Sequence, residues 1–286
     1  MHDQAARLRQ LVNENQQQKK ARVITVTSGK GGVGKSNFTI NFALGLRDLG
    51  KKVVILDADF GLANLDVLLG ISVKSTLSNL IYDRKTIWDV LYKSEFGIDL
   101  VAGGSGVRDL LSLEEGQLQY FLNQIDLLNQ YADYIIIDTG AGLSKETARF
   151  MIAADEVILV TTPEPTSITD AYAIIKMVHA TAQNIHYKLV INRAVNDMEG
   201  KATVDKLQLV SKRFLNIDLS ALGYLPDDVH VQNAVKKQQP FYLLYPNSEV
   251  TKSMKHIVNQ YLEVKTTKET SHGISGFINK MLKLLK

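Results

Sequence analysis

The sequence predicts an α/β fold, with a mostly parallel sheet that is covered by helices on both faces. Three observations lead to this prediction: short apolar runs recur along the chain, helical patterns lie between most of them, and a glycine-rich turn joins the first run to the first helix. The chain has 286 residues, of which 45% are apolar, so it can bury one large core.

The predicted elements follow in order along the chain. The first strand covers residues 23–27 and ends at the glycine-rich turn, after which a helix runs from about Ser36 to Leu49 and is closed by Gly50. The next strand covers residues 53–56. Further apolar strands are predicted at residues 134–137, 157–161, 188–191 and 222–225. Strands and helices that alternate in this way require crossover connections, which produce a parallel sheet.

Composition excludes several classes of function. The chain contains no cysteine, which rules out disulfides, thiolate metal sites, cysteine nucleophiles and iron–sulfur clusters. The net charge of +3 is small, so we expect no direct nucleic-acid binding. No apolar run resembles a signal peptide or is long enough to span a bilayer. We therefore expect a cytoplasmic protein that associates peripherally with the inner face of the cell membrane.

The glycine-rich turn carries a phosphate-binding motif. Residues 29–36 read GKGGVGKS and match the pattern G-x-x-x-x-G-K-[ST] between a strand and a helix. The backbone N–H groups of such a loop, together with the helix N-terminus, bind phosphate oxygens. Lys35 is expected to reach the β- and γ-phosphates, and the Ser36 hydroxyl to coordinate Mg²⁺. The predicted nucleotide-binding residues of this segment are Gly31, Gly32, Val33, Gly34, Lys35, Ser36 and Asn37.

Lys30 is a second lysine in this loop, and the ordinary motif has no role for it. The phrase KGGVGKS resembles the deviant phosphate loop of the MinD/ParA family, which has the SIMIBI type of P-loop NTPase fold, and the resemblance covers about residues 22–260. In that family the first lysine reaches across a dimer interface to the partner's phosphates. The resemblance implies ATP and Mg²⁺ as cofactors and an ATP-dependent homodimer in which Lys30 and Lys35 are catalytic.

Three aspartates follow predicted strands, where ligands of parallel sheets bind. The resemblance assigns Asp59 to positioning the attacking water and Asp57 to the hydration shell of Mg²⁺. An apolar strand that ends in an aspartate, as residues 134–137 do at Asp138, is typical of a Walker B carboxylate that holds Mg²⁺. For Asp57 and Asp59, solvated aspartates of an ordinary turn remain the alternative.

The resemblance also assigns a site for the base and the γ-phosphate. Its residues are Gly142, Glu164, Asn192, Leu225, Pro226 and Asp227. The Gly142 N–H would donate to the γ-phosphate, and the Asn192 amide would bind the adenine edge. No N-K-x-D guanine motif begins at Asn192, so ATP is expected rather than GTP. Glu164 either contacts the partner's ribose or is an ordinary loop residue before a proline.

The C-terminal residues form a separate amphipathic unit. On a helical wheel, residues 274–286 place lysines on one side and bulky apolar side chains on the other. This pattern is typical of an interfacial helix, and MinD-type proteins carry a similar tail. The predicted membrane-contacting residues are Phe277, Ile278, Met281, Leu284 and Leu285. A helix that docks on the protein's own core is the alternative.

The N-terminal residues point to a subgroup of the family. DQAARLR at residues 3–9, together with the core phrase LDADFGLANLDVLLG, resembles the flagellar-number regulators FlhG, also called FleN. The resemblance implies that this segment stimulates FlhF, a GTPase of the signal-recognition type. It also implies contact with flagellar basal-body (C-ring) proteins. The predicted partner-facing residues are Asp3, Gln4, Leu8 and Arg9.

The chain is thus expected to contain four segments, listed here in order. They are a flexible partner-activating segment (1–20), a P-loop ATPase domain (21–262), a linker (263–273) and a membrane-targeting helix (274–286). Three other functions remain open: a division-site MinD ATPase, a DNA-partition ATPase and a nucleotide-binding adaptor with little hydrolysis. The N-terminal extension argues against MinD, the amphipathic tail against partition, and the complete catalytic set against the adaptor.

Overall fold

The structure is a computed structural model, and it describes residues 20–59, 65–103, 114–183, 185–263 and 271–285. The strands are β1 (Arg22–Thr27), β2 (Val53–Ala58), β3 (Leu91–Lys93), β4 (Asp99–Ala102), β5 (Tyr134–Thr139), β6 (Glu156–Thr161), β7 (Tyr187–Ala194) and β8 (Ser220–Pro226). The helices are α2 (Lys35–Asp48), α3 (Leu65–Leu69), α4 (Leu77–Tyr82), α5 (Ile87–Val90), α7 (Glu115–Tyr131), α8 (Lys145–Ala153), α9 (Pro165–His179), α10 (Asp197–Leu215), α11 (Val229–Lys236), α12 (Phe241–Leu244), α13 (Glu249–Glu263) and α14 (Gly273–Leu285).

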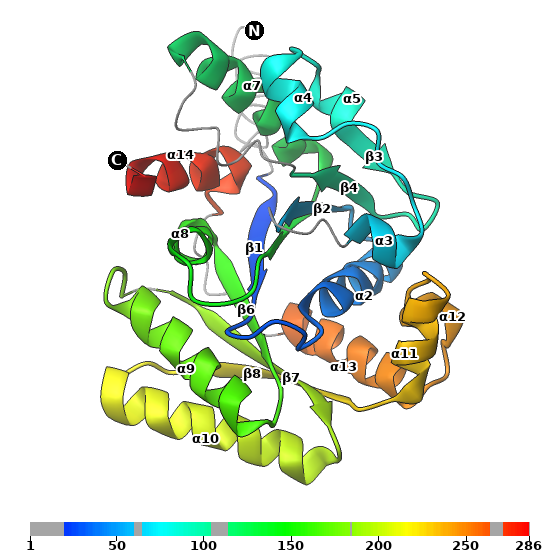
Figure 1. Ribbon diagram of the computed structural model, residues 1–286, viewed down its shortest axis with the longest axis vertical. Coiled ribbons are helices and arrows are strands. Elements are labelled where there is room, and N and C mark those ends of the chain that lie inside the picture. The colour runs from blue at the N-terminus through cyan, green and yellow to red at the C-terminus, as the bar shows by residue number, and fades with distance from the viewer. Residues whose placement is uncertain (1–19, 60–64, 104–113, 184, 264–270, 286) are drawn as a thin grey trace, which may run out of the picture.

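The eight strands form one sheet in the order β3-β4-β2-β5-β1-β6-β7-β8. All neighbouring strands are parallel except β3, which pairs antiparallel with β4 at one edge. Figure 1 shows helices on both sides of this sheet. The predicted fold class is therefore confirmed, and the predicted strands and first helix agree with the observed ones to within a few residues.

Two short strands, β3 and β4, were not predicted from the sequence. β3 has three residues and β4 has four, so neither produces an apolar run long enough to be recognised. β4 is nevertheless almost fully buried, because it pairs with β2 in the parallel part of the sheet. The short antiparallel β3 then closes that edge.

Alternation of side chains along the strands divides the core into layers. Ile24 and Val26 point to the face covered by α2 and α13, whereas Val23 points to the opposite face, where α7, α8 and α14 pack. Each of these three residues is fully buried, and each such side chain contributes about 1.5–3 kcal/mol of transfer free energy. The parallel strands all end at one edge, so the loops that follow them meet there.

Candidate nucleotide site

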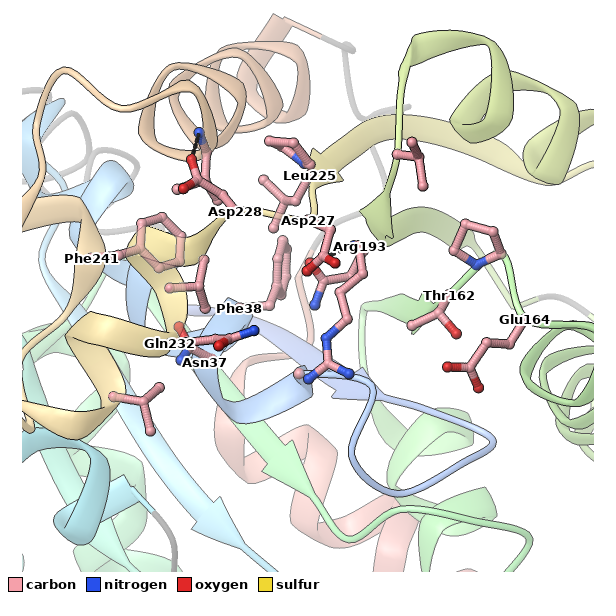
Figure 2. A pocket seen from close by; sticks show the side chains of 18 of the residues that line it. Asn37, Phe38, Thr162, Glu164, Arg193, Leu225, Asp227, Asp228, Gln232 and Phe241 are labelled. Atoms are coloured by element: carbon pink, nitrogen blue, oxygen red, sulfur yellow. Dashed lines mark hydrogen bonds between the residues drawn. The ribbon is translucent and has the colours of Figure 1, made fainter.

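A cavity of about 820 Å³ opens at the edge where the parallel strands end. Figure 2 shows side chains from α2, from the loops after β6, β7 and β8, and from α12 around this cavity. Its lining includes Asn37, Phe38, Glu164, Asn192, Arg193, Leu225, Pro226, Asp227, Val231, Phe241 and Val250. One part of the lining is apolar and the other polar, as expected for a site that receives a heterocyclic base with its sugar and phosphates. Seven of the residues predicted for nucleotide binding line it: Gly34, Asn37, Glu164, Asn192, Leu225, Pro226 and Asp227.

The glycine-rich loop connects β1 to α2 directly beside this cavity. Gly32 and Gly34 have φ angles of 78° and 90°, which glycine adopts without strain. A Cβ atom on Gly29 would lie 2.4 Å from the backbone carbon of Asp170 in α9, so the loop packs too closely for a side chain there. The loop ends at the N-terminus of α2, whose first N–H groups have no acceptor within the helix. The loop and the N-terminus of α2 thus form a site that can bind an anion.

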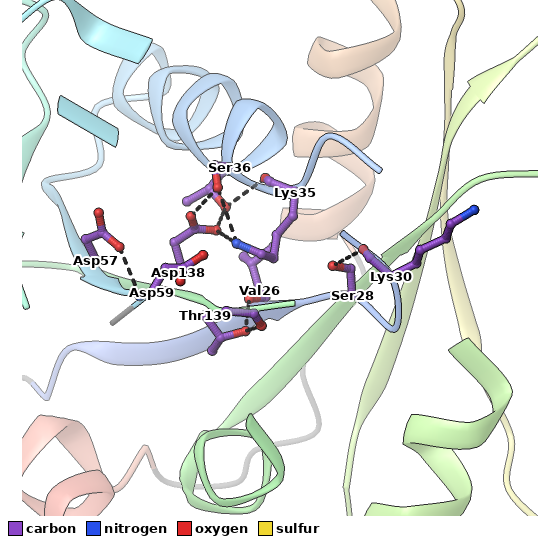
Figure 3. Close-up of polar contacts among 11 residues, drawn as sticks. Val26, Ser28, Lys30, Lys35, Ser36, Asp57, Asp59, Asp138 and Thr139 are labelled. Atoms are coloured by element: carbon purple, nitrogen blue, oxygen red, sulfur yellow. Dashed lines mark hydrogen bonds and ion pairs between the residues drawn. The ribbon is translucent and has the colours of Figure 1, made fainter. Parts of the chain in front are cut away.

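Asp138 holds the polar side chains of the loop together (Figure 3). It is the penultimate residue of β5 and is fully buried, and its Oδ1 accepts hydrogen bonds from Lys35 Nζ at 3.0 Å and Thr39 Oγ1 at 2.8 Å. Its Oδ2 accepts a hydrogen bond from Ser36 Oγ at 2.6 Å. Lys35 is 5% exposed, so its charge is compensated by a carboxylate rather than by water.

The donor set around Ser36 suits Mg²⁺. A serine hydroxyl lies against the Asp138 carboxylate, and Asp57 at the end of neighbouring β2 supplies a second carboxylate. Within the described part of the chain, no group of three or more histidine and acidic side chains is clustered to hold a metal by itself. Mg²⁺ binds through one or two carboxylates together with substrate phosphates and water, so these residues fit the ion when a nucleotide accompanies it.

Asp57 and Asp59 lie at the end of β2 and contact each other. The Asp59 backbone N–H donates to Asp57 Oδ1 at 3.0 Å. The pKa of Asp57 is raised to about 6, chiefly by burial and also by the nearby Asp138 carboxylate, whereas the Asp59 N–H and Lys35 lower it. Asp59 faces the loop after β5, because a Cβ atom on Gly140 would lie 3.6 Å from Asp59 Oδ1. Both aspartates thus lie beside Asp138 and the loop after β5, and their roles toward Mg²⁺ and water stay predictions.

We expect Asp57→Asn to stabilise the nucleotide-free protein at pH 7.5. The folded pKa of about 6 lies above the ordinary value of 3.8, so between these values the folded state binds more protons than the unfolded state. The free energy of unfolding therefore falls as pH rises through 6. Once Asp57 is fully ionised, its burial lowers that free energy by on the order of 3 kcal/mol. Urea unfolding without Mg²⁺ should show the variant more stable at pH 7.5 and its advantage shrinking by pH 4.5. An unchanged variant would contradict the burial of this charge, and Asp205→Asn on exposed α10 is the control.

Lys30 points away from the other loop side chains (Figure 3). Its Nζ donates hydrogen bonds of 3.0 Å to Glu164 Oε2 and to Thr166 Oγ1, at the start of α9. The Lys30 ammonium holds the pKa of Glu164 below its ordinary value. Lys30 is thus bound to its own chain, on the side of the loop opposite to Lys35 and Asp138.

Comparison with known proteins places this site in a family. The family model described as "ParA: NUBPL iron-transfer P-loop NTPase" matches residues 19–262. The chain belongs to the ParA/MinD family of P-loop NTPases. Antiactivator FleN of Pseudomonas aeruginosa is 39% identical over 239 residues, which are 84% of this chain and 85% of that protein. Since the chain contains no cysteine, the iron-transfer part of the family description has no thiolate ligands here.

Two further relatives extend the comparison. Flagellum site-determining protein YlxH of Helicobacter pylori is 32% identical over 296 residues, covering 100% of both chains. The septum site-determining protein MinD of Pyrococcus horikoshii, solved in complex with Mg-ADP, gives a TM-score of 0.67 at 24% identity and covers 87% of this chain and 99% of that one. The fold of this ParA/MinD-family chain is therefore that of MinD.

Two groups that were predicted to contact the nucleotide form hydrogen bonds within the protein instead. The Gly142 N–H donates to the Ser28 carbonyl at 2.9 Å, so it must leave this bond to reach a γ-phosphate. Asn192 Nδ2 donates to the Val33 carbonyl at 2.7 Å, and its Oδ1 accepts the Arg193 N–H at 3.0 Å. In this structure Asn192 therefore holds the phosphate loop, and its predicted contact with adenine stays a prediction.

Four large, exposed apolar side chains follow strands that end at the nucleotide edge, and these side chains were missed in the sequence. They follow the ends of β5, β7 and β8, and they are Leu143, Val195, Met198 and Val229, with exposed fractions of 52%, 77%, 79% and 61%. These residues could have been found from the sequence, because each is apolar and follows the end of a predicted strand by a few residues. Of these four, Val195 lines the nucleotide cavity and Met198 lines a separate pocket beside β8.

The predicted membrane helix is docked on the protein in this structure. α14 packs between α7 and α8, and Phe277, Ile278 and Met281 are 2%, 4% and 3% exposed. The Phe277 ring stacks on Phe150 of α8 at a centroid distance of 6.0 Å. Leu284 is half-buried, and the Leu285 side chain lies outside the described residues. The alternative of a helix docked on the protein's own core thus describes this structure, and contact of these residues with a membrane stays a prediction.

Polar contacts fix the start of α14. Asn129 Oδ1 of α7 accepts the Ile274 N–H at 2.9 Å. Ser271 Oγ donates to Asp155 Oδ2 at 2.8 Å and to the Ala21 carbonyl at 2.9 Å. Part of the predicted linker is therefore held against the core, whereas residues 264–270 lie outside the described residues.

The predicted partner-facing residues Asp3, Gln4, Leu8 and Arg9 also lie outside the described residues. In the part of the chain that the structure does describe, no helix has both the length and the apolar character needed to cross a membrane.

Proposed function

We propose that this protein is an ATP-hydrolysing, ATP-dependently dimerising switch that associates with the membrane and regulates flagellar number and placement. The observation that carries the proposal is the second lysine of the phosphate loop. Lys30 is bound to Glu164 and Thr166, away from the Lys35–Asp138 pair where phosphates bind. A loop lysine with this orientation acts on the γ-phosphate of a second subunit rather than on its own.

Exposed apolar side chains near the strand ends support the proposed homodimer. Leu143, Val195, Met198 and Val229 follow strands that end at the nucleotide edge, and a second copy that faces this edge would cover those beside the cavity, such as Val195. The same arrangement would bring each Lys30 to the partner's nucleotide. ATP would link the two halves, because its γ-phosphate supplies negative charge at the interface.

Each residue of the site has its own role in the proposed reaction. The loop backbone and Lys35 bind the β- and γ-phosphates, Ser36 and Asp138 hold Mg²⁺ with Asp57 in its hydration shell, and Asp59 orients the attacking water. Mg²⁺ supplies charge neutralisation when it is bound with ATP. The sequence at Asn192 lacks a guanine motif, so adenine is the preferred base.

The docked tail supports a reversible association with anionic membranes. α14 carries Phe277 and its apolar neighbours on the docked face, while Lys280 is half-buried and Lys283 is exposed. The apolar face can enter a bilayer only after it leaves the groove between α7 and α8. One short helix binds lipid weakly, so two tails in one ATP-bound dimer would bind far more strongly.

The proposed flagellar role is supported by the relatives. YlxH is named a flagellum site-determining protein and FleN an antiactivator, and the YlxH match extends over the whole chain, including its two ends. We propose that residues 1–20 stimulate an FlhF-type GTPase and that the ATPase also contacts C-ring proteins. Ala5, Leu8 and Leu11 in this segment have helical spacing, and a helix this short is marginal in water, so binding must provide its stability.

We expect a peptide of residues 1–20 to stimulate the GTPase without the ATPase core. Gln4→Ala or Leu8→Ala in the peptide should abolish the stimulation, and Gln17→Ala, outside the predicted helical pattern, should not. The measurement is GTP turnover of the purified GTPase with each peptide and with the chain that lacks residues 1–20. Full stimulation by the shortened chain, with none from the peptide, would refute the partner assignment and leave a MinD-like ATPase.

A further inference from the structure

The end of β7 has an irregular backbone beside the cavity. The pairing of β7 with β8 shifts register between Ile191 and Ala194. Within this bulge Arg193 has a φ angle of 58°, in the left-handed region that side-chain-bearing residues rarely adopt. Bulges of this kind redirect a side chain next to a binding site, and strained backbone persists where the surrounding structure enforces it.

The irregularity determines where the Arg193 side chain lies. In a regular strand, side chains at successive positions point to the two faces of the sheet, where helices cover them. Here Arg193 is exposed and lines the nucleotide cavity, and Figure 2 shows its side chain crossing the cavity between Gln232 on one side and Thr162 with Glu164 on the other. The backbone distortion therefore places a cation in the cavity.

The Arg193 guanidinium is not used elsewhere in the described part of the protein. Only its backbone N–H takes part in a hydrogen bond there, and its charge is attracted to the exposed Glu164. By contrast, Lys35 and Lys30 have carboxylate partners at 3.0 Å. A planar cation without a bonded partner is well suited to stack on an aromatic ring, because a flat face needs no fixed hydrogen-bond acceptor.

The opposite wall of the cavity is apolar. Phe38, Val231, Phe241 and Val250 provide this surface, while the phosphate loop provides the site for the charged end of a nucleotide. A base that enters the cavity would therefore have an apolar surface on one side. The guanidinium of Arg193 could then cover its second face.

We propose that Arg193 stacks on the base of the bound nucleotide and so contributes to its affinity. This inference rests on the proposed nucleotide-binding function and adds a residue to it. Guanidinium groups stack on every nucleobase, so Arg193 would increase the affinity for nucleotides without selecting adenine.

The test compares a complete nucleotide with its phosphates alone. Calorimetry would measure binding of ADP and of inorganic pyrophosphate to the full chain, to Arg193→Gly and to Arg193→Lys. Arg193→Gly should weaken ADP binding about threefold to tenfold and leave pyrophosphate binding unchanged. Arg193→Lys keeps the charge but loses the planar group, so its ADP affinity should fall between the other two.

A matched control is available in the same chain. Arg84 is exposed, has a φ angle of 52° and lies between α4 and α5, outside the cavity lining. Glycine relieves the strain at both positions, so Arg84→Gly and Arg193→Gly should both raise the thermal midpoint of the ligand-free protein. Only Arg193→Gly should weaken ADP binding. If Arg193→Gly has a raised thermal midpoint and binds ADP more weakly, the weaker binding cannot come from a loss of stability. The side chain then contacts the nucleotide rather than supporting the structure.

Three results would overturn the proposal in distinguishable ways. Unchanged ADP affinity in Arg193→Gly would show that the side chain makes no contact with nucleotide. An equal loss for pyrophosphate would show that it binds phosphate rather than the base. Absence of ADP binding by the unmodified chain would overturn the proposed function, and this inference with it.

Discussion

Asp59→Ala is expected to lower ATP turnover by a factor of about 10² to 10⁴, because it removes the carboxylate that orients the attacking water. The loss should leave ATP affinity nearly unchanged, since the phosphate loop, Lys35 and Asp138 form the binding site without this side chain. The Asp59 backbone N–H still donates to Asp57 after the substitution, so the loop after β2 keeps its anchor.

Phosphate release at saturating Mg-ATP measures this effect, and calorimetry measures the affinity. Asp205→Ala is the matched control, because Asp205 is an exposed aspartate on α10 that does not line the cavity. Turnover within a factor of about three of the unmodified chain would contradict the assignment. In that case the catalytic residue would have to be sought elsewhere at the nucleotide edge.

Gly273→Val is expected to increase binding to anionic liposomes without ATP. Gly273 has a φ angle of 67°, and a Cβ atom there would lie 2.4 Å from Asn129 Oδ1, so valine opposes the docked position of α14. The apolar face and the lysines of the tail stay intact. Apparent affinity scales with the fraction of molecules whose tail is free, so an increase of about tenfold or more is expected.

A substitution within the apolar face of the tail should instead decrease binding to liposomes. Phe277→Asp places a carboxylate at a position that is 2% exposed, so the tail also leaves its groove, yet it can no longer bury its apolar face in lipid. Sedimentation with liposomes should therefore rise for Gly273→Val and vanish for Phe277→Asp. Equal binding of both variants would show that α14 is not the membrane anchor.

The parallel part of the fold could be predicted from the sequence because its strands are buried on both faces. β1, β2, β5 and β6 are continuous apolar runs, and such runs need no knowledge of neighbours to be recognised. β3 and β4 are too short to give that signal, and their place at the sheet edge depends on pairing between strands far apart in the chain.

Side-chain partners were harder to predict than positions. The sequence places Lys30, Asn192 and Gly142 at the nucleotide edge, but only the folded chain shows that Glu164, Val33 and Ser28 bind them. α14 presents the same difficulty, because an apolar helical face fits a membrane or a protein groove equally well. The groove between α7 and α8 is formed by residues over a hundred positions away, so no local pattern reveals it.

The dimer is the central claim, and the molar mass of Asp59→Ala by light scattering after size-exclusion chromatography tests it most directly. With hydrolysis blocked, the account predicts twice the chain mass in saturating Mg-ATP and one chain mass in Mg-ADP. Lys30→Ala added to the same chain should shift the ATP form toward the monomer. A monomeric Asp59→Ala protein at saturating ATP would contradict the account.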